Sequence, residues 1–293
     1  MATRHSKSHL TVHPFPDCSV PLLRPFLRWA GGKQRLVREL LKFVPDRGSY
    51  GRYFEPFLGA GSLFFALKPN EATIGDVNAE LINCYRQVAA DPASVFRQLK
   101  KLEGRHSKEF FYDIRAILPE SLEPFHRAAR FIYLNKSAFN GIYRVNLQGV
   151  FNVPFGPTIS GLSIPPLDLL QNSAKCLKRA SLRSKDFEDT LRSVKPADFI
   201  YLDPPYPPLS TTSFFAHYSS GRFDWPDQQR VATAFRQLSE KGCFVMLSNA
   251  DLPAVTSLYK GFRINRLNAL RWVGSNGDRY SVSEVVITNY RFH

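Results

Sequence analysis

Short apolar runs, glycine turns and amphipathic segments alternate along the first and last parts of the chain. The pattern predicts strands at Tyr53–Leu58, Ala72–Ile74, Phe199–Leu202, Cys243–Leu247 and Glu284–Tyr290, and helices at Gln34–Val44, Ser62–Leu67 and Gln228–Leu238. A strand, a glycine turn, a helix and a second strand are typical of the first half of a doubly wound α/β domain. We therefore predict an α/β fold, with the last strand in an antiparallel terminal hairpin.

The pattern changes from Leu81 to about Lys185, where the spacing is mainly helical, apart from expected loops at Ser160–Pro166 and Asn172–Lys175. Residues 86–185 hold 16 Lys or Arg against 7 Asp or Glu, and so carry most of the net charge of +14. The α/β pattern returns at Leu182. We predict an irregular tail at 1–25, a first part of the α/β domain at 26–84, a basic helical lobe at 85–180 and a second part of the α/β domain at 181–293.

Composition narrows the class of protein. The 293 residues are 44% hydrophobic and 22% charged, as in ordinary globular proteins, but the excess of basic residues points to a polyanionic partner. The four cysteines are far apart and indicate neither a zinc site nor a disulfide framework, so we expect no metal. No apolar run approaches the length of a membrane span, and Met1–Leu10 lacks the apolar core of a signal peptide. We expect a cytoplasmic protein.

The segment Asp203-Pro204-Pro205-Tyr206 follows a short apolar strand. Prolines end a strand because they lack the N–H that the ladder needs. An acid, two rigid carbonyls and an aromatic ring are thus expected at the carboxyl end of a strand, where open α/β sheets bind ligands. A carboxylate and a proline carbonyl can accept both hydrogens of one amino group, and the tyrosine ring can stack on the ring that carries it. The segment suits an aromatic amine such as adenine, although a simple Pro-rich turn has the same pattern.

A second candidate site comprises Gly59-Ala-Gly61 and Asp76. The glycine turn lacks the third glycine of the dinucleotide fingerprint, so it does not require a pyrophosphate. Asp76 ends the next strand, where an acid commonly holds ribose hydroxyls, but a helix cap is an equally good interpretation. A nucleoside that carries a carboxylate, such as S-adenosyl-L-methionine, would fit this pair.

Four motifs in order resemble those of one family. They are Phe26–Lys33 (FLRWAGGK), Phe54–Ser62 (FEPFLGAGS), Asp76–Asn78 (DVN) and Asp203–Tyr206 (DPPY). Together they resemble the Dam-type (D12 class, alpha-ordered) DNA adenine-N6 methyltransferases from about Phe26 to Tyr290. The resemblance implies a Rossmann-like S-adenosylmethionine-dependent methyltransferase sheet, in which 26–84 and 181–293 form the catalytic domain and 85–180 the DNA target-recognition lobe.

The resemblance also implies roles for individual residues. The expected cofactor-binding residues are Trp29, Lys33, Phe57, Gly59, Gly61, Asp76, Phe187 and Asp203, and the expected catalytic residues are Asp203, Pro204 and Tyr206. Lys33 can pair with the methionine carboxylate of the cofactor, and Phe187 can pack on its adenine ring. Taken alone, Trp29 is more typical of a core aromatic residue and Lys33 of a surface charge.

A predicted hairpin carries the candidate DNA contacts. Tyr143–Leu147 and Val150–Val153 alternate around Gln148-Gly149, after the turn signal Asn140-Gly141. Such a hairpin fits the major groove, where arginine can bond guanine O6 and N7 together. By resemblance, the expected DNA-binding residues are Phe139 as a wedge between bases, Asn140, Ile142, Arg144 as the guanine reader, and Pro154, with GATC as the expected site.

The resemblance continues after Asp203–Tyr206, at Thr212–Tyr218 and Phe223–Gln228. Ser248-Asn249 is expected to end a strand near the cofactor side. The expected partner is double-stranded DNA, with no obligate protein partner and with a cognate restriction endonuclease as an open alternative. Three other functions share parts of the pattern: an RNA adenine methyltransferase, a catalytically silent DNA-binding relative and a glutamine methyltransferase. The last usually has Asn at the position of Asp203.

Overall fold

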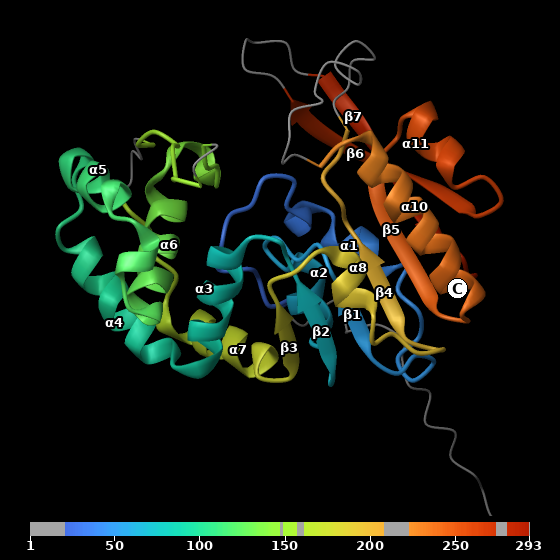
Figure 1. Cartoon of the computed structure of the whole chain (residues 1–293), viewed down its shortest axis with the longest axis horizontal. Helices are drawn as coiled ribbons and strands as arrows, with labels where there is room; N and C mark the ends of the chain where they lie inside the picture. The colour runs from blue at the N-terminus through green and yellow to red at the C-terminus, as the bar shows by residue number, and fades with distance from the viewer. Residues whose placement is uncertain (1–20, 147–148, 157–160, 208–222, 274–279, 293) are drawn as a thin grey trace, which may run out of the picture.

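The computed structural model describes residues 21–146, 149–156, 161–207, 223–273 and 280–292. Its strands are β1 (Tyr53–Glu55), β2 (Ala72–Gly75), β3 (Ala180–Arg183), β4 (Phe199–Leu202), β5 (Phe244–Ala250), β6 (Arg263–Val273) and β7 (Tyr280–Thr288). Within the described ranges they form a seven-stranded sheet in the order β3-β2-β1-β4-β5-β7-β6 (Figure 1). β1 to β5 pair with one another in parallel, whereas β7 pairs antiparallel with β5 and β6. The predicted α/β class and terminal hairpin are confirmed.

The order of the strands places one crevice in the sheet. From β1 the chain moves to β2 and then β3 on one side, and β4 and β5 lie on the other side. The direction of winding therefore reverses between β1 and β4, and ligands of open α/β sheets bind beyond the carboxyl ends of the strands at such a point. The loop after β1 contains Gly59 and Gly61, and the loop after β4 contains Asp203. The two predicted sites thus meet there.

Both faces of the sheet are buried, which explains why its central strands are apolar without strict alternation. Tyr53 and Tyr201 belong to one buried cluster, with helical side chains from between residues 37 and 177. Phe54 and Leu202 belong to the other, with helical side chains from between residues 187 and 258. β1 and β4 therefore contribute neighbouring residues to two different cores, and the centre of the sheet is fixed from both sides beneath the crevice.

The helices agree with the predicted ones in place more than in length. They are η1 (Lys33–Arg35), α1 (Val37–Leu41), α2 (Ser62–Leu67), α3 (Ala79–Ala90), α4 (Pro92–Glu103), α5 (Lys108–Ala116), η2 (Pro119–Ser121), α6 (Pro124–Ser137), η3 (Phe139–Gly141), α7 (Leu167–Leu177), α8 (Phe187–Leu191), α10 (Trp225–Glu240) and α11 (Pro253–Leu258). The loop predicted at Asn172–Lys175 is wrong, because it lies inside α7. Asn172 and Lys175 are exposed while Ala174 is buried, so these polar residues are the outer face of an amphipathic helix.

The basic middle of the chain is helical, as predicted. Figure 1 shows α4, α5 and α6 on one side of the strands, whereas α10 and α11 lie on the other side beside β5. α6 packs against α3, α4 and α5. The predicted boundary between residues 84 and 85 falls within α3. The division into domains, and the role of this helical part in recognising DNA, stay predictions.

Parts of the predicted organisation lie outside the described residues. These parts are 1–20 of the predicted tail, Leu147 and Gln148 of the predicted hairpin, Ser160 of a predicted loop, and 212–218 of the segment after Asp203–Tyr206. Residues 21–25 form neither helix nor strand. Across the part of the chain that the structure describes, every helix is too short or too polar to cross a membrane.

Candidate active site

The glycine turn after β1 is shaped by the indole of Trp29. Gly59 has a φ of 47°, and a Cβ on it would lie 2.7 Å from Cδ1 of Trp29. Gly61 has a φ of 68° and comes directly before α2. Because a side chain at either position would be strained, the turn requires glycine. Trp29 also stacks on Tyr143, with ring centroids 5.7 Å apart and an interplanar angle of 15°.

Asp76 is held at the end of β2 by backbone donors. The N–H of Gly59 donates to its Oδ2 at 3.1 Å, and the N–H of Asn78 donates to its Oδ1 at 2.9 Å. Burial raises the pKa of Asp76, and the two N–H groups oppose this shift. The cap of α3 is Asn78, whose side chain accepts from the N–H of Leu81 at 3.0 Å. The helix-cap interpretation therefore applies to Asn78, which leaves the carboxylate of Asp76 facing the crevice.

The predicted catalytic turn, Asp203–Tyr206, belongs to a compact cluster of charged side chains. Nζ of Lys33, a residue only 4% exposed, lies 2.7 Å from Oδ1 of Asp203. The same ammonium group lies 4.5 Å from the centre of the Tyr206 ring and donates to the carbonyl of Gly31 at 3.1 Å. The lysine that the sequence assigned to the cofactor carboxylate thus contacts the predicted catalytic acid.

Two buried glutamates complete this cluster, and sequence reasoning missed both. The hydroxyl of Tyr206 donates to Oε2 of Glu284, which lies 4.0 Å from Nζ of Lys33. Glu55 accepts from the hydroxyl of Tyr53 at 2.8 Å, and burial raises the pKa of Glu55 to about 8. Glu55 directly follows Tyr53-Phe54 and Glu284 directly precedes Val285-Val-Ile287, and an acid beside such a run is the sequence signal that could have found them.

Phe187 begins α8 and is largely covered. Its ring stacks on Phe57 with centroids 5.2 Å apart, and it is 2% exposed. The guanidinium of Arg230 lies 4.8 Å from the ring centre. Phe57 and Phe187 therefore form one aromatic wall of the crevice, as expected for residues that pack near a planar ligand.

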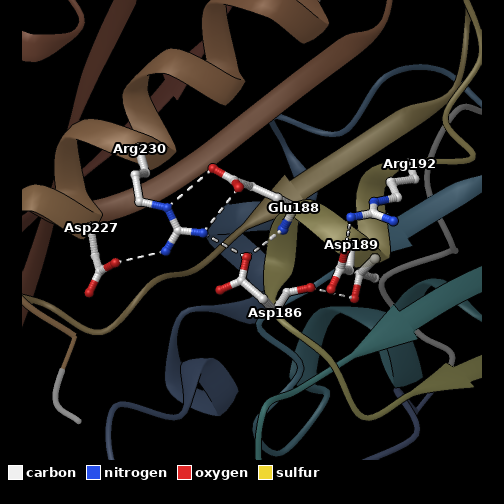
Figure 2. A network of polar contacts seen from close by, with 7 residues as sticks. Asp186, Glu188, Asp189, Arg192, Asp227 and Arg230 are labelled. Atoms are coloured by element: carbon white, nitrogen blue, oxygen red, sulfur yellow. Dashed lines mark hydrogen bonds and ion pairs between the residues drawn. The ribbon is translucent and has the colours of Figure 1, made fainter.

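The N-terminus of α8 is tied to α10 by an ionic network (Figure 2). Arg230 pairs with Asp186 at 2.8 Å, with Glu188 at 3.1 Å and with Asp227 at 2.8 Å. The hydrogen bond with Glu188 is the main cause that raises the pKa of Arg230, and the bonds with Asp227 and Asp186 add to it. Asp186 also accepts from the N–H of Glu188 and so caps α8. This network fixes the aromatic wall relative to the helix that follows the catalytic turn.

One cavity of about 1130 Å³ joins these groups. Its lining includes every predicted cofactor-binding and catalytic residue: Trp29, Lys33, Phe57, Gly59, Gly61, Asp76, Phe187, Asp203, Pro204 and Tyr206. Arg144 lines it as well, whereas the other predicted DNA-binding residues, Phe139, Asn140, Ile142 and Pro154, do not belong to its lining. Asp186, Asp227 and Tyr143, which sequence reasoning did not single out, also line it. Two sequence-distant motifs therefore share one pocket.

The predicted recognition hairpin is present among residues 143–146 and 149–153. Val145 and Phe151 form an antiparallel bridge, and the N–H of Asn152 donates to the carbonyl of Arg144 at 3.1 Å. Nε of Arg144 donates to Oδ1 of Asn152 at 2.8 Å. Phe139 lies in the turn η3, before the hairpin, and is 50% exposed.

Comparison with known proteins gives the family. Residues 29–273 match the D12 class N6 adenine-specific DNA methyltransferases. The chain is 40% identical over 275 residues to the type II methyltransferase M1.LlaDCHI of Lactococcus lactis subsp. cremoris, which covers 92% of this chain and 96% of the relative. The chain belongs to the D12 class of N6 adenine-specific DNA methyltransferases. It is also 35% identical to the type II methyltransferase M.MjaIII of Methanocaldococcus jannaschii, over 92% of this chain and 99% of the relative, and 32% identical to the DNA adenine methylase of Escherichia coli, over 90% and 94%.

This D12 methyltransferase is an adenine-specific DNA methyltransferase, and enzymes of its class use S-adenosyl-L-methionine as the methyl donor. The family decides against the RNA and glutamine alternatives. The cavity fits such a donor in size and chemistry, since it combines an aromatic wall, a carboxylate at a strand end and a lysine.

Proposed function

We propose that this methyltransferase modifies N6 of an adenine that has left the stack of double-stranded DNA, within GATC. The observation that carries the proposal is the shared cavity, where Asp203, Pro204 and Tyr206 lie beside Trp29 and Asp76. Catalytic and cofactor motifs come from opposite sides of the point where the sheet reverses its winding. An amino group held by the catalytic turn is therefore next to the space for the donor.

The cofactor site would use three kinds of group. Trp29, Phe57 and Phe187 offer apolar and aromatic surface, Asp76 can accept hydrogen bonds from ribose hydroxyls through its remaining lone pairs, and Gly59 and Gly61 shape the turn. Lys33 and Asp203 would lie where the space for the cofactor meets the space for the base. S-adenosyl-L-methionine, when bound, supplies an electrophilic methyl group on its sulfonium.

The catalytic turn would position and polarise the adenine amino group. The carboxylate of Asp203 and the carbonyl of Pro204 each accept a hydrogen bond from one N–H of this amino group. These two bonds direct the nitrogen lone pair out of conjugation with the ring. Tyr206 stacks on the base while its hydroxyl stays bonded to Glu284. Alignment of this kind can supply roughly 7–11 kcal/mol of barrier reduction. Nζ of Lys33 lies 2.7 Å from Oδ1 of Asp203 and helps to hold this side chain in place.

The recognition residues would select and extrude the base. An enzyme that modifies a base must take it out of the stack, which costs a few kcal/mol of stacking and pairing. Phe139, half exposed in its turn, can enter the space that the adenine leaves, with Asn140 beside it. Arg144 can read a guanine, while Ile142 and Pro154 contact the groove. The exposed guanidinium and aromatic ring support this assignment, and the GATC site rests on the family resemblance.

The direct test measures substrate and target together. Purified enzyme and tritiated S-adenosyl-L-methionine are offered duplex DNA in competition with structured RNA, and modified adenines are mapped by sequencing DNA from cells that express the chain. We expect transfer to duplex DNA, with methyl-adenine in GATC. Preferential transfer to RNA, an absence of turnover, or adenines modified in another sequence would each contradict a separate part of the proposal.

Salt provides a second test of the DNA interface. Lys and Arg contacts with phosphates release counterions, so the affinity for duplex should fall steeply with salt, by roughly 10³–10⁵ between 50 and 200 mM for six to ten contacts. Binding of a fluorescent duplex across this range measures the slope. A flat dependence would remove the basic helical part from the interface.

A restriction endonuclease remains a candidate partner of this enzyme. Two relatives are named type II methyltransferases. If the pairing exists, extracts of the source cells should cut unmodified DNA at the mapped site and spare DNA that this enzyme has methylated. Extracts that leave both DNAs intact would argue for a solitary methylase.

A further inference from the structure

A chain of buried amides connects the end of β5 to the catalytic turn. The N–H of Ala250 donates to Oδ1 of Asn249 at 2.8 Å, and Nδ2 of Asn249 donates to Oε1 of Gln228 at 3.0 Å. Nε2 of Gln228 then donates to the carbonyl of Pro205 at 2.7 Å. Asn249 is fully buried and Gln228 is 1% exposed. The three bonds join β5, α10 and the segment Asp203–Tyr206.

The direction of this chain is set at both ends. A backbone N–H can only donate, so Ala250 fixes Oδ1 of Asn249 as the acceptor and turns its amide nitrogen towards Gln228. A proline carbonyl can only accept, so the nitrogen of Gln228 must face Pro205. The two requirements agree on one orientation for each amide. Reversing either amide would set two acceptors or two donors against each other at both of its contacts.

At its Gln228 end, the hydrogen-bond chain restrains a backbone segment that has little other rotational freedom. The rings of Pro204 and Pro205 fix φ at both residues, and Asp203 is restricted because a proline follows it. The bond from Gln228 fixes the direction of the carbonyl of Pro205, so the rotation about Pro205 is set as well. Pro204, the residue just before it, lines the cavity.

We propose that Gln228 and Asn249 are positioning residues for methyl transfer: their directional hydrogen-bond chain holds the catalytic turn in the orientation that the adenine amino group requires. Neither side chain touches the reacting atoms, and neither lines the cavity. The inference rests on the proposed roles of Asp203 and Pro204. It goes beyond them because it places the control of the catalytic geometry on two amides outside the motif.

The variant Gln228→Glu separates positioning from simple packing. A neutral carboxylic acid can accept from Asn249 and donate its O–H to the carbonyl of Pro205, as the amide does, whereas an ionised carboxylate can only accept. The variant should therefore gain a pH dependence that the parent enzyme lacks, with kcat closest to the parent at low pH. At higher pH its kcat should fall on the order of 100-fold, as for other small displacements of reacting groups. KM for DNA and cofactor should change much less.

Gln237→Glu is the matched control, because Gln237 is exposed on the same helix and the substitution adds the same charge. Its pH profile should match that of the parent. A Gln228→Glu enzyme with the parent kcat at every pH would overturn the proposal. Thermal unfolding of each variant across the same pH range shows whether a loss of kcat merely follows a loss of fold.

A double-variant cycle covers the case in which a charged variant is too unstable to assay. Gln228→Leu and Asn249→Leu each break the chain, so single-turnover rates should fall by similar factors. The double variant should be no slower than either single one, because groups that act as one unit are not additive. Multiplying losses would overturn the proposal. If the parent enzyme itself fails to methylate duplex DNA, the proposed function fails instead, which a parent assay in the same series shows directly.

Discussion

The turn Asp203–Tyr206, which we propose as the catalytic turn, and the turn from Phe139 to Arg144, which we propose as the recognition turn, are held in different ways. The catalytic turn is fixed by buried partners from three elements: Lys33 near its acid, Glu284 on its tyrosine and Gln228 on its second proline. The recognition turn is exposed at Phe139 and at Arg144. The first turn has buried partners within the protein, whereas the second has exposed side chains.

The difference follows from what each turn must do. Transfer of a group requires reacting atoms held within a fraction of an ångström, and this precision comes from rigid, buried support. Recognition of DNA requires side chains that reach base edges beyond the surface of the protein, so their final partners belong to the duplex. Asn135 bonds to both backbone groups of Arg28 and to the carbonyl of Gly141, so the second turn is joined to the segment that carries Trp29 and Lys33.

The largest expected effect is the loss of kcat when the acid of the proposed catalytic turn is removed. Asp203→Ala removes an acceptor of the amino group and should lower kcat by at least about 10²–10³-fold, the cost of losing one preorganised polar contact. Duplex binding should stay largely intact, because the exposed recognition residues are untouched. Rapid-quench methyl transfer and fluorescence anisotropy measure the two quantities on the same preparation.

Two further variants guard this result. Asp203→Asn keeps the shape but leaves Lys33 without the negative charge that lies 2.7 Å away, so it should be nearly as slow. Asp113→Ala removes an exposed acid from α5 and should behave as the parent. Near-normal turnover by Asp203→Ala would contradict the mechanism, and a matching loss of DNA binding would contradict the independence of the two turns.

The same contrast explains what the sequence could predict. Asp76 and Asp203 were identified because each follows an apolar strand and precedes a turn, and carboxyl ends of parallel strands meet at one edge. Such signals are local. Phe139 and Arg144 were identified through resemblance, and their position in and after a turn agrees with the Asn140-Gly141 signal, since Asn140 has a φ of 54°.

The partners that support the catalytic turn could not be predicted. Glu284 reaches Tyr206 across 78 positions of the chain, and Gln228 reaches Pro205 across 23. A sequence shows that a polar residue stands in an apolar run, but the identity of its partner depends on the strand order. The misread loop at Asn172–Lys175 has a similar origin, because local polarity does not distinguish a loop from the exposed face of a helix.

A smaller effect is expected when the recognition side is broken. Arg144→Ala should reduce discrimination between the cognate site and a site with one guanine replaced by about 1–3 kcal/mol, the worth of one bidentate contact. kcat on the cognate site should fall much less than for Asp203→Ala. The ratio of kcat/KM for the two duplexes measures the discrimination directly.

Charge and geometry can be separated at this position. Arg144→Lys keeps the positive charge but lacks the fork that bonds two acceptors, so it should lose most of the discrimination while retaining affinity. Arg38→Ala, an exposed residue of α1, removes the same charge elsewhere and should leave discrimination unchanged. An unaltered recognition profile for Arg144→Ala would remove this residue from base reading.

A separate prediction concerns how stability depends on pH, and it distinguishes the two turns through their buried acids. The segment from Phe139 to Phe155 contains no Asp or Glu, whereas Glu55 is buried next to the catalytic turn with a pKa of about 8 in place of 4.5. Between these values the folded state binds a proton that the unfolded state has lost. The stabilising contribution is therefore complete below about pH 4.5, declines by at most about 1.4 kcal/mol for each pH unit above it, and is lost above pH 8. Glu55→Gln should remove this decline, so that its advantage in thermal unfolding over the parent grows from pH 5 to pH 8, whereas the exposed control Glu240→Gln should follow the parent. Parallel unfolding curves for Glu55→Gln and the parent would show that Glu55 titrates as an ordinary surface acid.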